Sequence, residues 1–469
     1  MRLTLVAVMA AFALASVRAG QQGGGTMSTV RLMTLDPGHF HAALIQKEMY
    51  PGVAQRVDVY APAGWDLDEH LKRVQAYSKR AEKPTAWQME VHAADDFLER
   101  MLRERPGNAV IMSGRNRPKI DRIARSVDAG LHVLADKPWI LTTADLPKLD
   151  AVLATAERKG VVAYDIMTER FEITTMLQRA LVNDAAVFGE IVKGTEAEPG
   201  VYMESVHHLM KVVSGAPNIR PAWFFDAVEQ GEGLNDIGTH LVDLVQWTLF
   251  PGRAVDYRAD LRVLAAQRWP TVIPETEFQR VTGGQSFGAN LKPFVKNGAL
   301  EYYANTLVSY AVRGVYTTLN VIWDWEAPPG GGDTHFAFYR GTRARIEVRQ
   351  TAADRYLTEL FVVPASTSLQ AEVLAATQTA VKALEARYPG IGVEERGAEI
   401  HVTVPAALRD GHEAHFAQVA QNFLGYIRDR RTLPSWERPN MLAKYFVTTT
   451  GTELSRQSPP RVAPRIAPR

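Results

Sequence analysis

Short apolar runs alternate with helical segments along the first third of the chain, from Thr29 to about Tyr164. The runs that predict strands cover residues 30–35, 57–60, 109–112, 133–134 and 161–163. The segments between them with helical periodicity cover residues 41–49, 68–79, 94–103, 118–128 and 143–159. Parallel strands need a long crossover, usually a helix, so this order predicts a doubly wound parallel sheet of the α/β class over residues 29–165.

The pattern changes after about Arg170, where aromatic and β-branched residues become frequent. Alternation of apolar and polar residues is clearest in residues 300–325 and 335–348, and it predicts strands with one buried face. The helices predicted in this part cover residues 172–182, 371–388 and 412–430. We therefore expect an α+β domain with a large mixed or antiparallel sheet over residues 166–457. Residues 458–469, rich in proline and arginine, are predicted to form a disordered tail.

The first residues have the pattern of a secretory signal peptide. Arg2 precedes an apolar run over residues 3–15, and Val17 and Ala19 occupy the positions that a signal peptidase reads. The run of about 13 residues is too short for a helix across a bilayer of roughly 30 Å. We predict a signal peptide over residues 1–19, a linker over 20–28, and a periplasmic or secreted protein with no membrane insertion once the signal is removed. A start at Met27 would instead leave the protein in the cytoplasm.

Two features of the composition limit the chemistry. Cysteine is absent, which excludes disulfides, thiolate nucleophiles and thiolate metal ligands. Lys and Arg number 53 against 52 Asp and Glu, and so balanced a charge predicts no nucleic-acid partner. Catalysis must therefore use Lys, His, Asp, Glu, Tyr or a bound cofactor.

The turn after the first predicted strand reads Leu35-Asp36-Pro37-Gly38-His39-Phe40-His41. A dinucleotide-binding fold has a glycine-rich turn here, G-x-G-x-x-G, where backbone N–H groups meet the pyrophosphate. Asp36, Gly38 and His41 take the three glycine positions, so one glycine is kept and an ordinary strand-to-helix turn is an equal alternative. The next strand ends Val59-Tyr60-Ala61-Pro62, with neither an acid for a ribose hydroxyl nor an arginine for a 2′-phosphate. NAD and NADP both stay open.

Two further segments carry a resemblance to a known family. Ala129-Gly130-Leu131-His132-Val133-Leu134 leads into Asp136-Lys137-Pro138, and residues 231–247 read GEGLNDIGTHLVDLVQW. Together they resemble the Gfo/Idh/MocA oxidoreductases, in which A-G-x-H-V-x-x-E-K-P ends a Rossmann strand and D-x-G-x-H-x-x-D opens a helix of the second domain. Aspartate replaces the glutamate before the lysine, and the resemblance covers residues from about 30 to 250. The set DPGHFH, ADKP, YDIMTER and RPxWFFD is similar to an exported subgroup of this family with its own C-terminal domain.

The resemblance implies a Rossmann domain that binds NAD or NADP, with Lys137 beside the nicotinamide and with Asp236 and His240 as the acid and histidine of the second domain. Oxidising a secondary alcohol needs a base that titrates near neutrality, and His240 can serve. Asp236 lies four residues earlier, so on a helix it can orient the ring, while Lys137 can stabilise the developing alkoxide. An N-cap acid and a packed histidine are the structural alternatives. The residues assigned to the cofactor are Asp36, Gly38, His39, His41, Asn116, Asp136 and Lys137.

Candidate substrate contacts lie near the predicted domain junction and in the second domain. They are Asp165, Glu169, Arg170, His207, Trp223 and Asp243. The first three follow a strand end, where an interdomain salt-bridge network is the alternative. His207 and Trp223 offer the polar and aromatic surface that a sugar requires. Because His207 and His208 are neighbours on a predicted strand, their rings should point to opposite faces, and we expect no metal.

We therefore expect an NAD(P)-dependent oxidoreductase that transfers a hydride to or from a secondary hydroxyl of a sugar, cyclitol or glycoside. Free nicotinamide nucleotide is scarce outside the cytoplasm, so the cofactor should be tightly bound. Oxidation followed by elimination, which would cleave a glycosidic bond without net NADH, is one alternative. A non-catalytic sugar-binding relative is another, although Lys137, Asp236 and His240 together argue against it. We also expect a homo-oligomer that associates through the C-terminal sheet.

Overall fold

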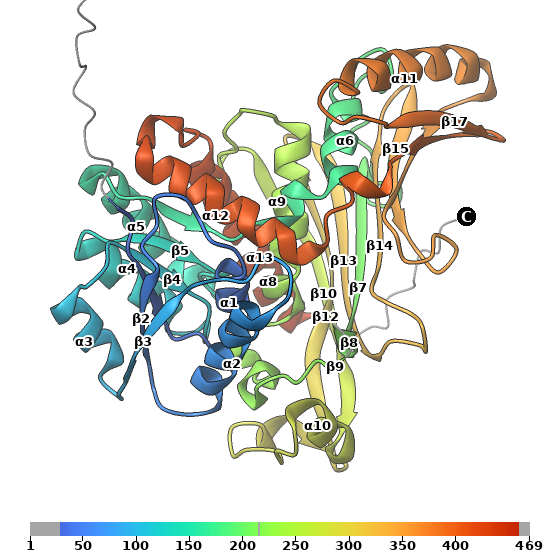
Figure 1. Cartoon of the computed structure of the whole chain (residues 1–469). Coiled ribbons are helices and arrows are strands. Elements are labelled where there is room, and N and C mark those ends of the chain that lie inside the picture. The colour runs from blue at the N-terminus through green and yellow to red at the C-terminus, as the bar shows by residue number, and fades with distance from the viewer. Residues whose placement is uncertain (1–28, 214–215, 459–469) are drawn as a thin grey trace, which may run out of the picture.

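The computed structural model describes residues 29–213 and 216–458 (Figure 1). The predicted signal peptide over 1–19, the linker over 20–28 and all but the first residue of the predicted tail lie outside the described residues. Within the described ranges, no helix is both long and apolar enough to cross a membrane.

The N-terminal domain has a six-stranded sheet in which every neighbouring pair is parallel, in the order β3-β2-β1-β4-β5-β6. Its strands are β1 (Leu32–Leu35), β2 (Arg56–Ala61), β3 (Gln88–Ala93), β4 (Ala109–Met112), β5 (His132–Ala135) and β6 (Ala163–Asp165). The order reverses between β1 and β4, so a crevice for a ligand is expected beyond the C-terminal ends of these strands. The predicted Rossmann sheet is thereby confirmed.

Helices connect these strands, as the alternation in the sequence predicts. They are α1 (His41–Ile45), α2 (Trp65–Lys79), α3 (Phe97–Glu104), α4 (Lys119–Asp128) and α5 (Leu146–Lys159). Apolar residues three or four apart bury one face of each long helix, such as Leu149, Val152 and Ala156 of α5. Helix α5 ends at Gly160, whose φ of 70° suits the left-handed C-terminal position. Helix α1 is shorter than predicted and has only five residues.

The C-terminal domain has a ten-stranded mixed sheet in the order β10-β12-β13-β7-β14-β15-β16-β18-β17, with β11 paired to β12. Strands β13 and β7 are parallel, and the other pairs are antiparallel. The strands are β7 (Val201–Met210), β10 (Leu261–Pro274), β11 (Val295–Lys296), β12 (Ala299–Val312), β13 (Val315–Glu326), β14 (Thr334–Arg340), β15 (Ala344–Gln350), β16 (Glu359–Pro364), β17 (Gly392–Arg396) and β18 (Glu399–Thr403). The predicted mixed sheet is confirmed.

Helices lie between the two sheets and at both ends of the larger sheet (Figure 1). They are α6 (Ile173–Val182), α7 (Ala227–Gln230), α8 (Gly233–Asp236), α9 (Gly238–Leu249), α10 (Glu275–Thr282), α11 (Gln370–Leu384), α12 (His412–Arg428) and α13 (Glu437–Gln457). A short hairpin of β8 (Val212–Val213) and β9 (Ala216–Pro217) and a 3-10 helix, η2 (Thr168–Phe171), complete the elements used below.

The last two helices return to the N-terminal domain. Phe416 and Phe423 of α12 are buried in the same apolar cluster as Leu32 of β1. Tyr445 of α13 is buried with residues of β5 and α5. Helices α12 and α13 follow the predicted domain boundary at residue 165, yet both contribute to the core of the N-terminal domain.

A network of buried charged side chains joins β6, η2, α9 and α13. Arg170 donates to both carboxylate oxygens of Asp243 at 2.6 and 2.7 Å and to Glu437 at 2.6 Å. Lys444, which is fully buried, donates to Asp165 at 2.6 Å and to Asp243 at 3.4 Å. Burial alone would raise the pKa of Asp243, but the nearby Arg170 and Lys444 lower it to about 2. Asp165, Arg170 and Asp243 were candidate substrate contacts. In the structure they form an interdomain salt-bridge network with Glu437 and Lys444.

We expect Lys444→Met to destabilise the protein by about 3–5 kcal/mol, because the buried Asp165 carboxylate would lose its ion-pair partner. Urea unfolding followed by tryptophan fluorescence would measure the loss. The matched control is Arg438→Met, whose ion pairs with Asp150 and Glu157 are half-exposed and should contribute about 0–1 kcal/mol. Equal losses in the two variants would contradict the role of the buried network.

Candidate active site

Lys137 and Asp236 meet where the two domains join. Lys137 follows the end of β5 and donates from Nζ to Asp236 Oδ1 at the end of α8. Helix α8 approaches the second sheet closely, because a Cβ on Gly233 would stand 1.8 Å from the Ala304 carbonyl oxygen. This glycine therefore sets how far α8 carries Asp236 toward Lys137. Burial would raise the pKa of Asp236, but Lys137 holds it below its ordinary value.

His240 lies in the first turn of α9, buried at 8% exposure. Its Nδ1 has no hydrogen-bond partner among the described residues. Burial, reinforced by the charge of Lys137, lowers its pKa to about 3. The expectation that His240 titrates near neutrality is therefore wrong for the resting protein. Asp236, expected to orient this ring, instead accepts a hydrogen bond from Lys137 Nζ.

Histidines from three elements gather around Glu169 of η2. Nδ1 of His412, at the start of α12, lies 3.3 Å from Glu169 Oε1. Burial raises the pKa of Glu169, but the hydrogen bond and charge of His412, with smaller effects from His240 and His415, hold it far below its ordinary value. Burial lowers the pKa of His335, on β14, to about 4, and the charge of Glu169 opposes that shift. His335 and His412 were not predicted as site residues. The signal that could have found His412 is its spacing from His415, three residues later on the same helix face.

The turn predicted to hold the pyrophosphate packs against the end of β4. Asp36 has φ of 49°, in the left-handed region that glycine favours, and its carboxylate pairs with Arg122. The backbone N–H of His39 donates to the Ser113 carbonyl at 2.6 Å. A Cβ on Gly114 would stand 2.1 Å from the Asp36 carbonyl oxygen, so glycine is required where the two turns meet.

A pocket opens beside Gly38. It is lined by Pro37–Phe40, by Trp65, Asp66, Glu69, His70 and Arg73 of α2, and by Asn218–Pro221 and Phe224. Trp223 Nε1 donates to Asp66 Oδ2 at 3.0 Å, and Arg115 pairs with the same oxygen at 3.0 Å. A Cβ on Gly38 would stand 2.9 Å from Asp66 Oδ2 and 3.0 Å from the Trp223 ring. Trp223 thus joins the second domain to the turn.

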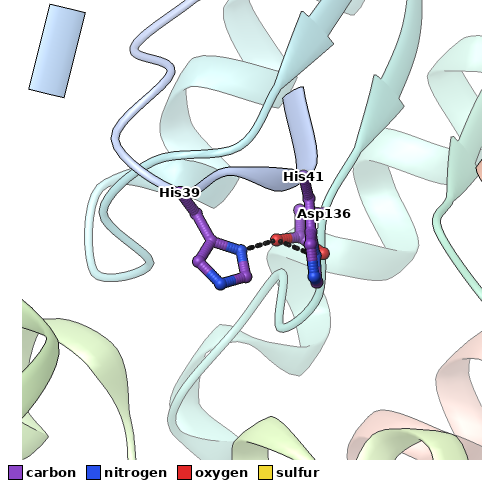
Figure 2. Close-up of side chains that lie close together, drawn as sticks. All are labelled: His39, His41 and Asp136. Carbon is purple, nitrogen blue, oxygen red and sulfur yellow. Dashed lines mark hydrogen bonds and ion pairs between the residues drawn. The ribbon is translucent and has the colours of Figure 1, made fainter. Parts of the chain in front are cut away.

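His39 and His41 converge on Asp136, at the end of β5 (Figure 2). Their Nδ1 atoms lie 2.8 and 3.0 Å from Asp136 Oδ2, and Ser113 Oγ donates to the same oxygen at 3.2 Å. Burial lowers the pKa of both histidines, that of His41 to about 3. These three predicted cofactor residues form one cluster beside Lys137.

Two other predicted residues lie elsewhere. Asn116 is buried and donates to the carbonyl and side-chain oxygens of Gln230 at 2.7 and 2.9 Å, so its amide fastens α7 to the N-terminal domain. His207, on β7, pairs with Asp333 at 3.2 Å. His208 reaches the same carboxylate at 3.2 Å, so the adjacent rings share one partner despite their opposite expected directions.

Comparison with known proteins places the chain among oxidoreductases. The model of the family described as "Putative oxidoreductase C terminal domain" matches residues 177–456, more than half of the chain. A solved structure described as a "putative oxidoreductase" from Parabacteroides merdae is 45% identical, covers 92% of this chain and 98% of its own, and has a TM-score of 0.89.

More distant solved structures share the fold. A levoglucosan dehydrogenase in complex with NADH and levoglucosan is 16% identical, covers 91% of this chain and 97% of its own, and has a TM-score of 0.58. GenD2 from gentamicin A biosynthesis, in complex with NAD, is 14% identical, covers 92% and 94%, and has a TM-score of 0.54. No curated protein sequence matches the chain.

The lowered pKa of His240 predicts a pH dependence of stability. Its pKa is about 3 in the folded protein and about 6.5 when unfolded, so the unfolded state binds one more proton between these values and stability falls as the pH falls below 6.5. From pH 7.0 to 5.5 this histidine should remove about 1 kcal/mol. In His240→Gln the loss of unfolding free energy over that interval, measured by urea titration, should be smaller by this amount. The control is Thr239→Ser, which changes no titratable group and should lose as much unfolding free energy as wild type. The same loss in His240→Gln as in wild type would contradict the lowered pKa of His240.

Proposed function

The chain belongs to this oxidoreductase C-terminal-domain family and is of the Gfo/Idh/MocA type, and from that premise we propose that it transfers a hydride between NAD or NADP and a secondary hydroxyl of a sugar-like substrate. The observation that carries the proposal is the buried contact between Lys137 Nζ and Asp236, with His240 one helical turn further on. Levoglucosan dehydrogenase, which shares the fold, binds NADH and a sugar derivative, and this supports the same classes of ligand here.

The residues present fit a nicotinamide nucleotide at two points. The pocket beside Gly38 lies beyond the C-terminal end of β1, where dinucleotide phosphates lie in this sheet topology. Arg73 and Arg220 line that pocket and can supply positive charge. At the other point, the unpartnered Nδ1 of His240 is a buried polar atom that can bind a ligand. The His39 N–H is bonded to Ser113, so the phosphates would use other donors.

Lys137 and Asp236 act together on the reacting hydroxyl. The bound nucleotide would accept or return the hydride at the substrate carbon. Lys137 is a buried cation that can attract the oxygen that becomes negative as its proton leaves, and burial strengthens that attraction. Asp236 holds the ammonium group in place, because Nζ is already bonded to Oδ1.

His240 enters the reaction as a neutral imidazole. With a pKa of about 3 the ring is neutral at working pH. Its Nδ1 can therefore accept the hydroxyl proton in one tautomer, or donate a hydrogen bond to the hydroxyl oxygen in the other. Lys137 disfavours charge on the ring, and Glu169 favours it. The charge of the Glu169 carboxylate therefore assists proton movement toward His240.

Polar groups around Glu169 suit a sugar. Glu169 and His412 offer hydrogen-bond acceptors and donors near His240, and His335 lies near Glu169. His412 is exposed enough to meet solvent. A sugar ring presents several hydroxyls at fixed spacing, and binding them needs such convergent groups. We therefore assign substrate binding to this cluster.

Lys137→Met and His240→Gln should each reduce kcat by roughly 10²–10⁴, because each removes a group that acts on the reacting hydroxyl. Turnover would be followed through nicotinamide absorbance with a panel of sugars, cyclitols and glycosides. Nucleotide affinity, measured by fluorescence titration, separates a catalytic loss from a binding loss. Lys148→Met, which removes a surface lysine paired with Asp121, is the control and should leave kcat unchanged. Activity within about threefold of wild type in either site variant would exclude that residue.

Hydride transfer and oxidation–elimination differ in their products. We expect the mature chain, residues 20–469, to retain nicotinamide nucleotide through gel filtration, and nucleotide released by denaturation would identify it. With a glycoside substrate we expect one NAD(P)H for each substrate oxidised and an intact glycosidic bond. Release of free sugar with no net NAD(P)H would instead support cleavage by elimination. Protein that emerges without nucleotide and binds it only at millimolar concentration would contradict a tightly bound cofactor.

A further inference from the structure

His39, His41 and Asp136 form a buried cluster with the donor atoms of a metal site. The residues come from the β1–α1 turn, the first turn of α1 and the end of β5 (Figure 2). Their nearest nitrogen and oxygen atoms all lie within 4.8 Å of one another. Side-chain exposures of 16%, 9% and 3% leave His39 as the most accessible member.

Hydrogen bonds within the cluster are distributed unevenly. Asp136 Oδ2 accepts hydrogen bonds from His39 Nδ1, His41 Nδ1 and Ser113 Oγ. Asp136 Oδ1, in contrast, is buried and has no hydrogen-bond partner among the described residues. A buried carboxylate oxygen without a donor or cation is costly, and such atoms are rare in folded proteins. The carboxylate therefore has an unused acceptor, Oδ1, beside the oxygen on which the two imidazoles converge.

Two imidazole nitrogens and one carboxylate are a common ligand set for divalent first-row transition metals. Such ligands lie about 2.0–2.2 Å from the ion, so ligand atoms roughly 3 Å apart can share one ion. The two Nδ1 atoms lie 2.8 and 3.0 Å from Oδ2, which matches this spacing. We propose that His39 Nδ1, His41 Nδ1 and the Asp136 carboxylate bind one divalent transition-metal ion of the Mn²⁺-to-Zn²⁺ series, with its remaining positions open to a ligand.

Surrounding contacts hold His41 and Asp136 in place before any ion binds. The His41 ring packs on Phe416 of α12 at 4.5 Å between centroids. Lys119 Nζ donates to the Asp136 carbonyl at 2.9 Å and fixes the main chain at the end of β5. Outer contacts of this kind orient metal ligands and raise affinity. The site departs from our sequence-based expectation of no metal, which weighed only His207 and His208.

The test of this proposal is direct metal binding, and it needs no nucleotide. Full mature protein is stripped with chelator and titrated with Zn²⁺ and with Mn²⁺ by calorimetry, and metal content is measured after gel filtration. We expect one ion per chain and a rise in thermal midpoint on metal addition. His39→Gln and His41→Gln should each weaken binding at least tenfold, and the double variant more than about 100-fold. His401→Gln, which alters a buried histidine paired with Glu359 on β16, is the matched control and should leave binding unchanged.

A spectroscopic arm needs no variant and covers the case in which one fails to fold. X-ray absorption of the Zn²⁺-loaded wild type should show two imidazoles and oxygen ligands. Three results would overturn the proposal: metal content well below one ion per chain, stoichiometric binding that the double variant leaves intact, or an ion without two imidazoles. If wild type binds no metal, a loss of NADH affinity in the variants would assign these residues to the nucleotide.

Discussion

The buried ion pair between Lys137 and Asp236 fixes the geometry on which the active site depends. Each partner comes from a different domain, so the pair exists only when β5 and α8 are docked. Removing two charges from water is costly, and excellent geometry is needed to offset it. That geometry is maintained elsewhere: Gly233 sets the approach of α8, and the network around Arg170 and Lys444 holds α9 and α13 against β6.

Sequence periodicity predicted most of the fold because buried parallel strands are continuous apolar runs. Strands β1 and β4 are buried at every position and were found on that signal. The edge strand β3 has no buried position and was missed. Helix α13 was missed because its middle is rich in threonine, a weak helix former, and tertiary packing rather than propensity makes it helical.

Family resemblance located the residues of the site, but it did not predict the properties of those residues that depend on burial. Lys137, Asp236 and His240 lie together, but the pKa of His240 depends on burial and on Lys137, which no local pattern encodes. For the same reason sequence could not distinguish substrate contacts from structural ion pairs at Asp165 and Arg170. The gathering of His335 and His412 around Glu169 joins β14, η2 and α12, which are remote in sequence.

The balance of charge at the β1–α1 turn connects the nucleotide with the metal. Asp36, Asp66 and Asp136 all lie near the place where dinucleotide phosphates are expected. Arg122 and Arg115 pair with the first two, whereas the partners of Asp136 are Ser113 Oγ and two imidazoles, which burial keeps neutral. Among the described residues no lysine or arginine pairs with the Asp136 carboxylate, so its negative charge works against the attraction that Arg73 and Arg220 offer a phosphate. A divalent ion on His39, His41 and Asp136 would reverse the sign of that charge, as bound cations do in phosphate sites, and would replace the attraction that a glycine-rich turn supplies through its backbone.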